Sequence, residues 1–214
     1  MQESVSGILR AVSNGLNVPV MIVLIILMAA TIVLLGTLIV EIFTEHRHLK
    51  VSMPKLIDEI RASKGKVAEC VNKSGLLKVQ KKILCEVTEH PELTDDMRTA
   101  MAAMLLEEEK ERLDKRVEIT NLIAKLGPIF GLLGTLIPLG PGIVALGQGD
   151  TYTLSDALLT AFDTTVAGLI AGAVAMVISA VRKKWYKNYN AILETLMECV
   201  LEMEANDETE EEQA

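Results

Sequence analysis

Three long stretches of apolar residues dominate the pattern of hydrophobic and polar positions along the chain. Residues 18–40 and 126–147 contain no charged side chain, and residues 157–181 contain only Asp163. Each stretch, as a helix rising about 1.5 Å per residue, is long enough to cross a hydrocarbon core about 30 Å thick. Any one stretch alone would also suit a buried soluble helix, but three together predict an all-α membrane protein. The expected transmembrane helices are 17–41, 122–147 and 155–182.

Basic residues are distributed unevenly around these stretches, and their distribution predicts the orientation of the chain. The loop after the second span, 139–154, has none, and the N-terminal segment has only Arg10. Because cationic flanks stay in the cytoplasm, we expect a multi-pass protein of the cytoplasmic membrane with its N-terminus outside and its C-terminus in the cytoplasm. The basic residues that flank the opposite ends of the spans are Arg47, Lys50, Lys55, Lys115, Arg116, Lys125, Arg182, Lys183, Lys184 and Lys187.

The region between the first two spans, 42–121, has apolar residues at helical spacing and predicts helical extensions of the membrane helices. One helix is expected to start at Ser52–Pro54, because proline is tolerated in a first turn. A second is expected from about 76 to 89. Thr94, followed by two aspartates, should cap a third, which meets no helix breaker before Gly127 and should continue into the second span. The third span should likewise continue as a cytoplasmic helix, 183–203.

Three shorter segments complete the expected organisation. Residues 1–16 carry apolar side chains at helical spacing, which suits either an amphipathic helix on the outer membrane surface or a disordered end. Residues 148–154 are expected to form an outer loop. Residues 204–214 are acidic without a single base, which is typical of a solvated, disordered tail, with an acidic interaction tail as the alternative.

Glycines recur along one face of the second span. Gly127, Gly131 and Gly134 stand at i, i+4 and i+7, and such small-residue faces let membrane helices approach closely. Pro128 frees a backbone carbonyl and permits a kink, which is either a fixed bend or a hinge. Thr135 adjoins the stripe, and its hydroxyl either bonds to its own helix or faces a lumen.

Asp163 is the only ionisable residue well inside a span. Burying it charged costs at least about 2.5 kcal/mol, so we expect it to be protonated, ion-bound, partnered or in contact with water. Helical spacing places it on one face with Asp156, Thr160, Thr164 and Ala167. Such a polar stripe, entering the membrane from outside, suits an ion route; the alternative is a structural aspartate near the outer end of the span.

Trp185 and Tyr186 follow the third span beside a basic cluster, which is typical of residues that anchor a helix at the membrane surface. Few other residues indicate a catalytic or metal-binding role. Cys70, Cys85 and Cys199 are scattered without metal-binding spacing and are expected to be free thiols. The sequence has neither a phosphate-binding loop nor a nucleophile–base pair. We therefore expect no enzyme, no metal, no cofactor and no nucleic-acid partner.

Two motifs in the last two spans resemble those of the MotA/TolQ/ExbB proton channel family, closest to its TolQ/ExbB branch. Pro128-x-x-Gly131-Leu132-x-Gly134-Thr135 is similar to the family's second-span pattern. Thr164-Thr165-x-x-Gly168-Leu169 is similar to its third-span pattern. The layout of the chain resembles the family from residue 17 to about 200, and residue detail does so from about 121 to 185.

The resemblance implies a homopentamer whose second and third spans line a central pore. A dimeric single-span partner of the ExbD/TolR/MotB type would lie in that pore and carry an aspartate that gains and loses a proton. Ion flow would then drive mechanical work across the envelope, as in a stator or a protein-transport complex. The resemblance places Thr135 and Thr165 along the ion path, together with the candidates Thr160, Asp163 and Thr164.

The chain departs from the family at one position. TolQ/ExbB proteins usually carry a glutamate about one turn before the third-span threonines, where this chain has Thr160. Asp163 or Asp156 is a candidate replacement, and the coupling ion is either a proton or sodium. The alternatives to an ion-driven subunit are a non-conducting scaffold of the same fold and a secondary transporter; transporters usually carry internal repeats, and none is found here.

Overall fold

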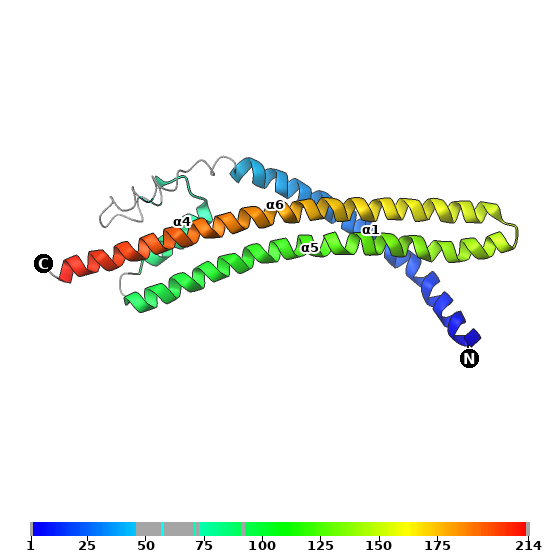
Figure 1. Cartoon of the computed structure of the whole chain (residues 1–214), viewed down its shortest axis with the longest axis horizontal. Coiled ribbons are helices and arrows are strands. Elements are labelled where there is room, and N and C mark those ends of the chain that lie inside the picture. Colours follow the sequence, from blue (N-terminus) through cyan, green and yellow to red (C-terminus); the bar gives the residue numbers. More distant parts are fainter. Residues whose placement is uncertain (1, 46–56, 58–70, 72, 91–92, 213–214) are drawn as a thin grey trace. The chain divides into compact units, whose positions relative to one another are not determined.

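The computed structural model describes the backbone of residues 2–45, 57, 71, 73–90 and 93–212. Its regular structure in these ranges is helical: α1 (Gln2–Glu45), α4 (Lys78–Thr88), α5 (Asp95–Gly147) and α6 (Thr151–Glu212) (Figure 1). Three of these helices are long and apolar enough to cross a membrane. The prediction of an all-α protein with three spans is therefore confirmed. The helix expected to start at Ser52–Pro54 lies almost entirely outside the described residues.

The chain divides into two compact units. One, which we call the span unit, consists of Met1–Ile39 and Val117–Val181. The other, which we call the extramembrane unit, consists of Val40–Arg116 and Arg182–Ala214. Both α5 and α6 are continuous helices that contribute to each unit, as expected for membrane helices that continue beyond the bilayer.

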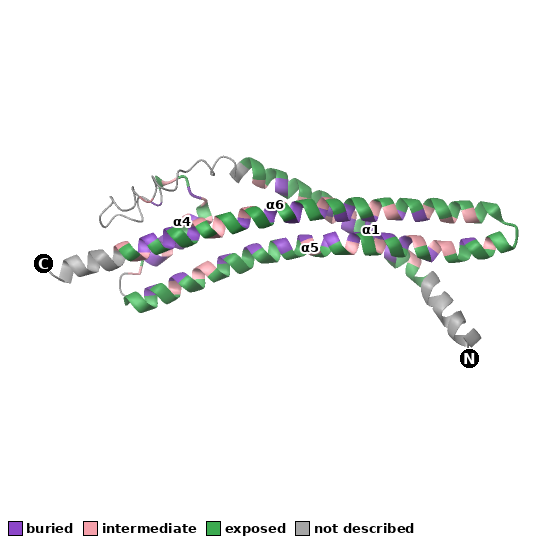
Figure 2. Ribbon diagram, in the orientation of Figure 1, coloured by how far each residue is buried: buried purple, intermediate pink, exposed green. Residues whose placement is uncertain are grey.

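In the span unit, α1 packs against α5 and α6 through small clusters of apolar side chains. Leu27 lies in a cluster with Ile123, Ala124 and Ala175, and a neighbouring cluster joins Val20 and Leu24 to Ile137. Most of the other large apolar side chains of the three spans are exposed (Figure 2). Such surfaces suit helices that meet lipid or other chains instead of water.

The extramembrane unit has a core like that of a soluble protein. Leu84 and Val87 of α4, Ala102 of α5, and Leu196 and Val200 of α6 are all buried in one cluster. The start of α4 is capped locally, because the Leu77 backbone N–H donates to Gln80 Oε1 at 3.2 Å. In its described residues, the unit thus packs α4, α5 and α6 around an apolar core of its own.

The connection between α5 and α6 is shorter than the predicted loop at 148–154. Only residues 148–150 separate the helices, and Gly149 takes a positive φ of 84° there. Asp150 caps α6: Oδ1 accepts the Thr153 backbone N–H at 3.0 Å, and Oδ2 accepts the Thr153 hydroxyl at 2.5 Å. The bond from the Thr153 hydroxyl is the main cause of a lowered pKa for Asp150, followed by the backbone N–H.

Helix extends to both ends of the described residues. Residues 204–212 continue α6, whereas a disordered tail is predicted from the sequence at 204–214; alanine and glutamate favour helix, and no breaker interrupts them. The segment 1–16 is not a separate surface helix, because α1 is continuous from Gln2 through Pro19 into the span. Helix α5 is also continuous through Pro128.

Candidate functional site

Helices α5 and α6 approach each other through glycines in the span unit. A Cβ atom on Gly168 would lie 2.5 Å from the carbonyl oxygen of Gly127 and 2.7 Å from the Cα of Gly131. A Cβ on Gly172 would lie 2.7 Å from Cδ of Pro128. Real Cβ atoms do not come this close to other heavy atoms, so the two backbones touch directly. The contact needs glycine on both helices.

Thr164 belongs to this same contact. Its side chain is buried, and a Cβ on Gly134 would lie 2.6 Å from the Thr164 Cβ. The Thr164 hydroxyl bonds to its own helix, at 3.0 Å from the carbonyl oxygens of both Thr160 and Ala161. Thr164 therefore packs between α5 and α6 and does not share an open face with Asp163.

The other three threonines of the predicted route are partly exposed, and each hydroxyl donates to its own helix. Thr135 donates to the Leu132 carbonyl at 2.7 Å, Thr160 to Asp156 at 3.1 Å and Thr165 to Ala161 at 3.0 Å. A hydroxyl that has donated its proton keeps lone pairs that accept from water or bind a cation. These side chains are thus fixed acceptors.

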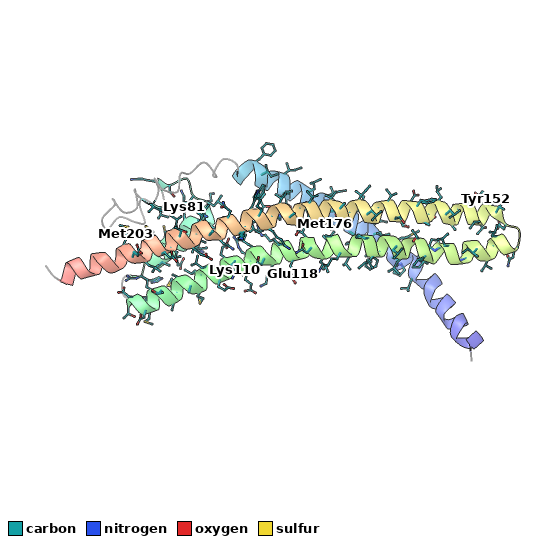
Figure 3. The ribbon with its side chains drawn as sticks, in the orientation of Figure 1. Lys81, Lys110, Glu118, Tyr152, Met176 and Met203 are labelled. Atoms are coloured by element: carbon teal, nitrogen blue, oxygen red, sulfur yellow. The ribbon has the colours of Figure 1, made fainter. Side chains whose placement is uncertain are left out.

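Asp163 is exposed on α6, among apolar side chains that are also exposed. Phe162 and Val166 flank it along the helix, 67% and 55% exposed. Within the described part of the chain, Asp163 accepts no hydrogen bond. A carboxylate on an apolar face at membrane depth must meet water, an ion or another chain in the assembled protein. Two other side chains of α6 are also exposed: Tyr152 at the start of the helix and Met176 near its middle (Figure 3).

Tyr186 is buried, whereas its place beside basic residues predicts an anchor at the membrane surface. Only 4% of it is exposed, and its hydroxyl donates to Glu41 Oε1 at 2.7 Å. Burial is the main cause that raises the pKa of Tyr186 to about 12, followed by the hydrogen bond to Glu41. Trp185, the other predicted anchor, is half-buried.

Glu41 gathers charged partners that the sequence analysis missed. Its Oε2 accepts from Arg182 Nε at 3.1 Å, and its Oε1 lies 4.0 Å from Arg116 Nη1. The sequence positions of Glu41 and Arg182 are 141 apart, so no local spacing could have revealed the pair.

A buried carboxylate, Glu109, lies in the same unit as Glu41. It accepts from Arg112 Nη2 at 2.6 Å and from the Tyr189 hydroxyl at 3.4 Å. The pKa of Arg112 is raised, mainly by its hydrogen bond to Glu109. Glu109 follows Glu107 and Glu108 in one run of glutamates, and those two are exposed. Nothing in the sequence of this run distinguishes the buried glutamate from the exposed ones.

A hydrogen bond between side chains joins α5 and α6 inside the span unit. The hydroxyl of Ser179, which is buried, donates to Asn121 Oδ1 at 2.5 Å. Neither residue was singled out from the sequence. In the residues that the structure describes, no three His, Cys, Asp or Glu side chains gather to hold a metal, and neither Cys85 nor Cys199 forms a disulfide.

Comparison with known proteins adds one finding. The sequence model of the MotA/TolQ/ExbB proton channel family matches residues 72–195, more than half of the chain. The matched segment contains both glycine–threonine motifs, the close contact between α5 and α6, and Asp163. A search of the curated proteins found no match.

Proposed function

Because the chain belongs to the MotA/TolQ/ExbB proton channel family, we propose that it is a pore-forming subunit of an ion-driven motor complex in the cytoplasmic membrane. The complex couples ion flow to mechanical work through a single-span partner of the ExbD/TolR/MotB type. The observation that carries the proposal is Asp163, an exposed carboxylate on an otherwise apolar membrane helix.

The ion route in this proposal runs along the exposed side of α5 and α6. Asp163 supplies the exchangeable charge, and Thr135, Thr160 and Thr165 supply hydroxyl oxygens whose protons are already bonded to the helix. Asp163 takes over the role of the glutamate that the family usually carries at the position of Thr160. A carboxylate with hydroxyl acceptors suits either a proton carried through water or a sodium ion.

The assembly that we propose is a homopentamer around a dimeric partner. It is supported by how little of each span the single chain buries, and by the close backbone contact of α5 with α6 around Gly127 and Gly168. The orientation that we propose follows the basic residues: the N-terminus and the connection 148–150 outside, and the extramembrane unit in the cytoplasm.

A non-conducting scaffold of the same fold is the second candidate. It is favoured by the threonine hydroxyls, each of which already bonds to its own backbone and needs no ion to satisfy it. A scaffold and a motor subunit would assemble alike, so assembly alone does not distinguish these two functions. Ion conduction in the presence of the partner distinguishes them.

Two measurements on the full-length chain test the proposal. The first is the mass of the detergent-solubilised complex with and without a single-span partner that has an intramembrane aspartate. We expect five copies of this chain; a monomer or dimer in both samples would contradict the pore. The second is partner-dependent dissipation of a proton or sodium gradient in liposomes. Flux of either ion supports the motor subunit, and its absence from an intact complex supports the scaffold.

A further inference from the structure

The chain passes between its two compact units three times, and a charged residue stands at each passage. The passages are at 39–40, 116–117 and 181–182. Within two residues of them are Glu41, Arg116 and Arg182. All three belong to the extramembrane unit, so their contacts lie inside one compact body.

Glu41 contacts each of the other two residues. One oxygen of the Glu41 carboxylate accepts Arg182 Nε at 3.1 Å. The other accepts the Tyr186 hydroxyl at 2.7 Å and lies 4.0 Å from Arg116 Nη1. One carboxylate of α1 is therefore shared by donors from α6 and by a cation of α5. We call Glu41, Arg116, Arg182 and Tyr186 the Glu41 cluster.

Burial distinguishes the Glu41–Arg182 pair from the ordinary ion pairs on the surface of the same helices, whereas the Arg116 side chain of the cluster is 51% exposed. The Arg182 side chain is 6% exposed and that of Glu41 is 16% exposed, whereas Lys115 and Glu111 of α5 form a pair with both side chains more than 60% exposed. Exposed pairs contribute little, but losing one partner of a buried pair leaves a charge without compensation. The cluster is consequently sensitive to any displacement of one helix against the others.

The neighbouring Glu109 contacts extend the same arrangement farther along the helices. Arg112 and Arg116 are one turn apart on α5, and Tyr186 and Tyr189 are about one turn apart on α6. Glu109 binds Arg112 and Tyr189, as Glu41 binds Arg182 and Tyr186. Two successive tyrosine–carboxylate–arginine groups thus join the helices on the extramembrane side of the passages.

We propose that Glu41 is a positioning residue for ion-driven motion, because its cluster holds the three chain passages in a fixed mutual arrangement. The inference rests on the proposed function for the motion itself. When ion movement displaces α5 and α6, the end of α1 then moves with them, because Glu41 ties it to both helices. Without this tie, α1 would slide independently. Glu41 touches no ion and acts through the arginines and the tyrosine.

Four variants of the full-length chain, in complex with its partner, test this role. Glu41→Gln keeps an acceptor for Tyr186 but removes the charge that Arg182 needs. Tyr186→Phe removes one donor and keeps the ring. Glu41→Gln combined with Arg182→Gln removes both charges, and the two amides can still bond to each other. Glu111→Gln is the matched control, since it breaks an exposed pair with Lys115.

Two readouts are needed: amide hydrogen exchange of residues 40–43 and 183–189, and partner-dependent ion flux in liposomes. We expect Glu41→Gln to speed amide exchange by about tenfold or more and to lower ion flux, because the buried Arg182 loses its charged partner Glu41 and the contact loosens. Tyr186→Phe should change both in the same direction but less. The double variant should return both the exchange rate and the ion flux most of the way to the wild-type values. Glu111→Gln should match the wild type in both.

The outcomes separate this inference from the proposed function. If Glu41→Gln behaves like Glu111→Gln in exchange, the cluster does not hold the helices and the inference is wrong. If exchange accelerates while flux stays at the wild-type level, the cluster is structural only, and the positioning role is overturned. If the wild type itself conducts nothing with its partner, the proposed function fails and the positioning role fails with it, while exchange still reports whether the cluster holds the helices.

Discussion

The carbonyl oxygen of Gly127 in α5 lies 2.5 Å from the position that a Cβ atom on Gly168 of α6 would occupy. The first glycine of the second-span stripe and the glycine of the third-span motif therefore face each other. At this contact, backbone atoms set the distance between α5 and α6. Neither helix can accept a side chain there without moving.

Gly168→Ala should destabilise the helix pair by about 1–3 kcal/mol, because the new methyl group meets backbone that cannot give way. Unfolding of the purified protein, followed by circular dichroism, measures the loss. Gly140→Ala is the control on α5, since nothing lies within 4 Å of a Cβ at that position. It should be neutral or slightly stabilising. Equal effects of the two substitutions would show that the close contact is absent.

Gly134→Ala should also be destabilising, but through a side chain. The added Cβ would lie 2.6 Å from Cβ and 2.8 Å from Oγ1 of Thr164. Thr164→Gly in the same chain should restore part of the stability, at the cost of about 1 kcal/mol for a glycine inside a helix. A double-mutant cycle measures the recovery. Additive losses would contradict a direct contact between residues 134 and 164.

Ser179→Ala should weaken the pairing of α5 and α6 by roughly 0.6 kcal/mol, and by no more than about 1.7 kcal/mol, as found for hydrogen bonds between membrane helices. The residue is buried and donates to Asn121. Combining it with Asn121→Ala should add little, because both substitutions remove the same bond. If the two losses are independent and additive, the bond contributes nothing of its own.

Tyr186 should ionise near pH 12, since burial and the bond to Glu41 raise its pKa from the ordinary value of 10.0. A raised pKa means that the folded protein favours the neutral phenol. The resulting stabilisation is therefore complete below about pH 10 and is lost as the pH rises from 10 towards 12. The difference in ultraviolet absorbance between the wild type and Tyr186→Phe isolates this titration. A midpoint near pH 10 would place Tyr186 in water.

The sequence predicted the spans and the glycine contact because both depend on local patterns. Charge-free stretches of sufficient length define the spans, and Gly127, Gly131 and Gly134 share a face by helical spacing alone. The start of α6 was predicted too late, although Asp150 and Thr153 together form a recognisable helix cap.

The clusters around Glu41 and Glu109 could not be predicted in the same way. Tyr186 stands next to Trp185 and a basic run, a pattern that indicates a lipid anchor. Its bond to Glu41 joins residues 145 positions apart. Whether an amphipathic tyrosine faces lipid or a buried carboxylate depends on which helix packs beside it, and that is a property of the tertiary structure. Thr164 was misplaced for the same reason, since spacing along α6 does not say where α5 lies.

Ion flux through liposomes that contain this chain and its single-span partner tests the central claim most directly, with Asp163→Asn beside the wild type. Asp150→Asn is the matched control, because asparagine also caps helices and residue 150 lies outside the proposed route. We predict partner-dependent flux for the wild type and for Asp150→Asn, and little or none for Asp163→Asn in an equally assembled complex. Undiminished flux through Asp163→Asn would contradict the account.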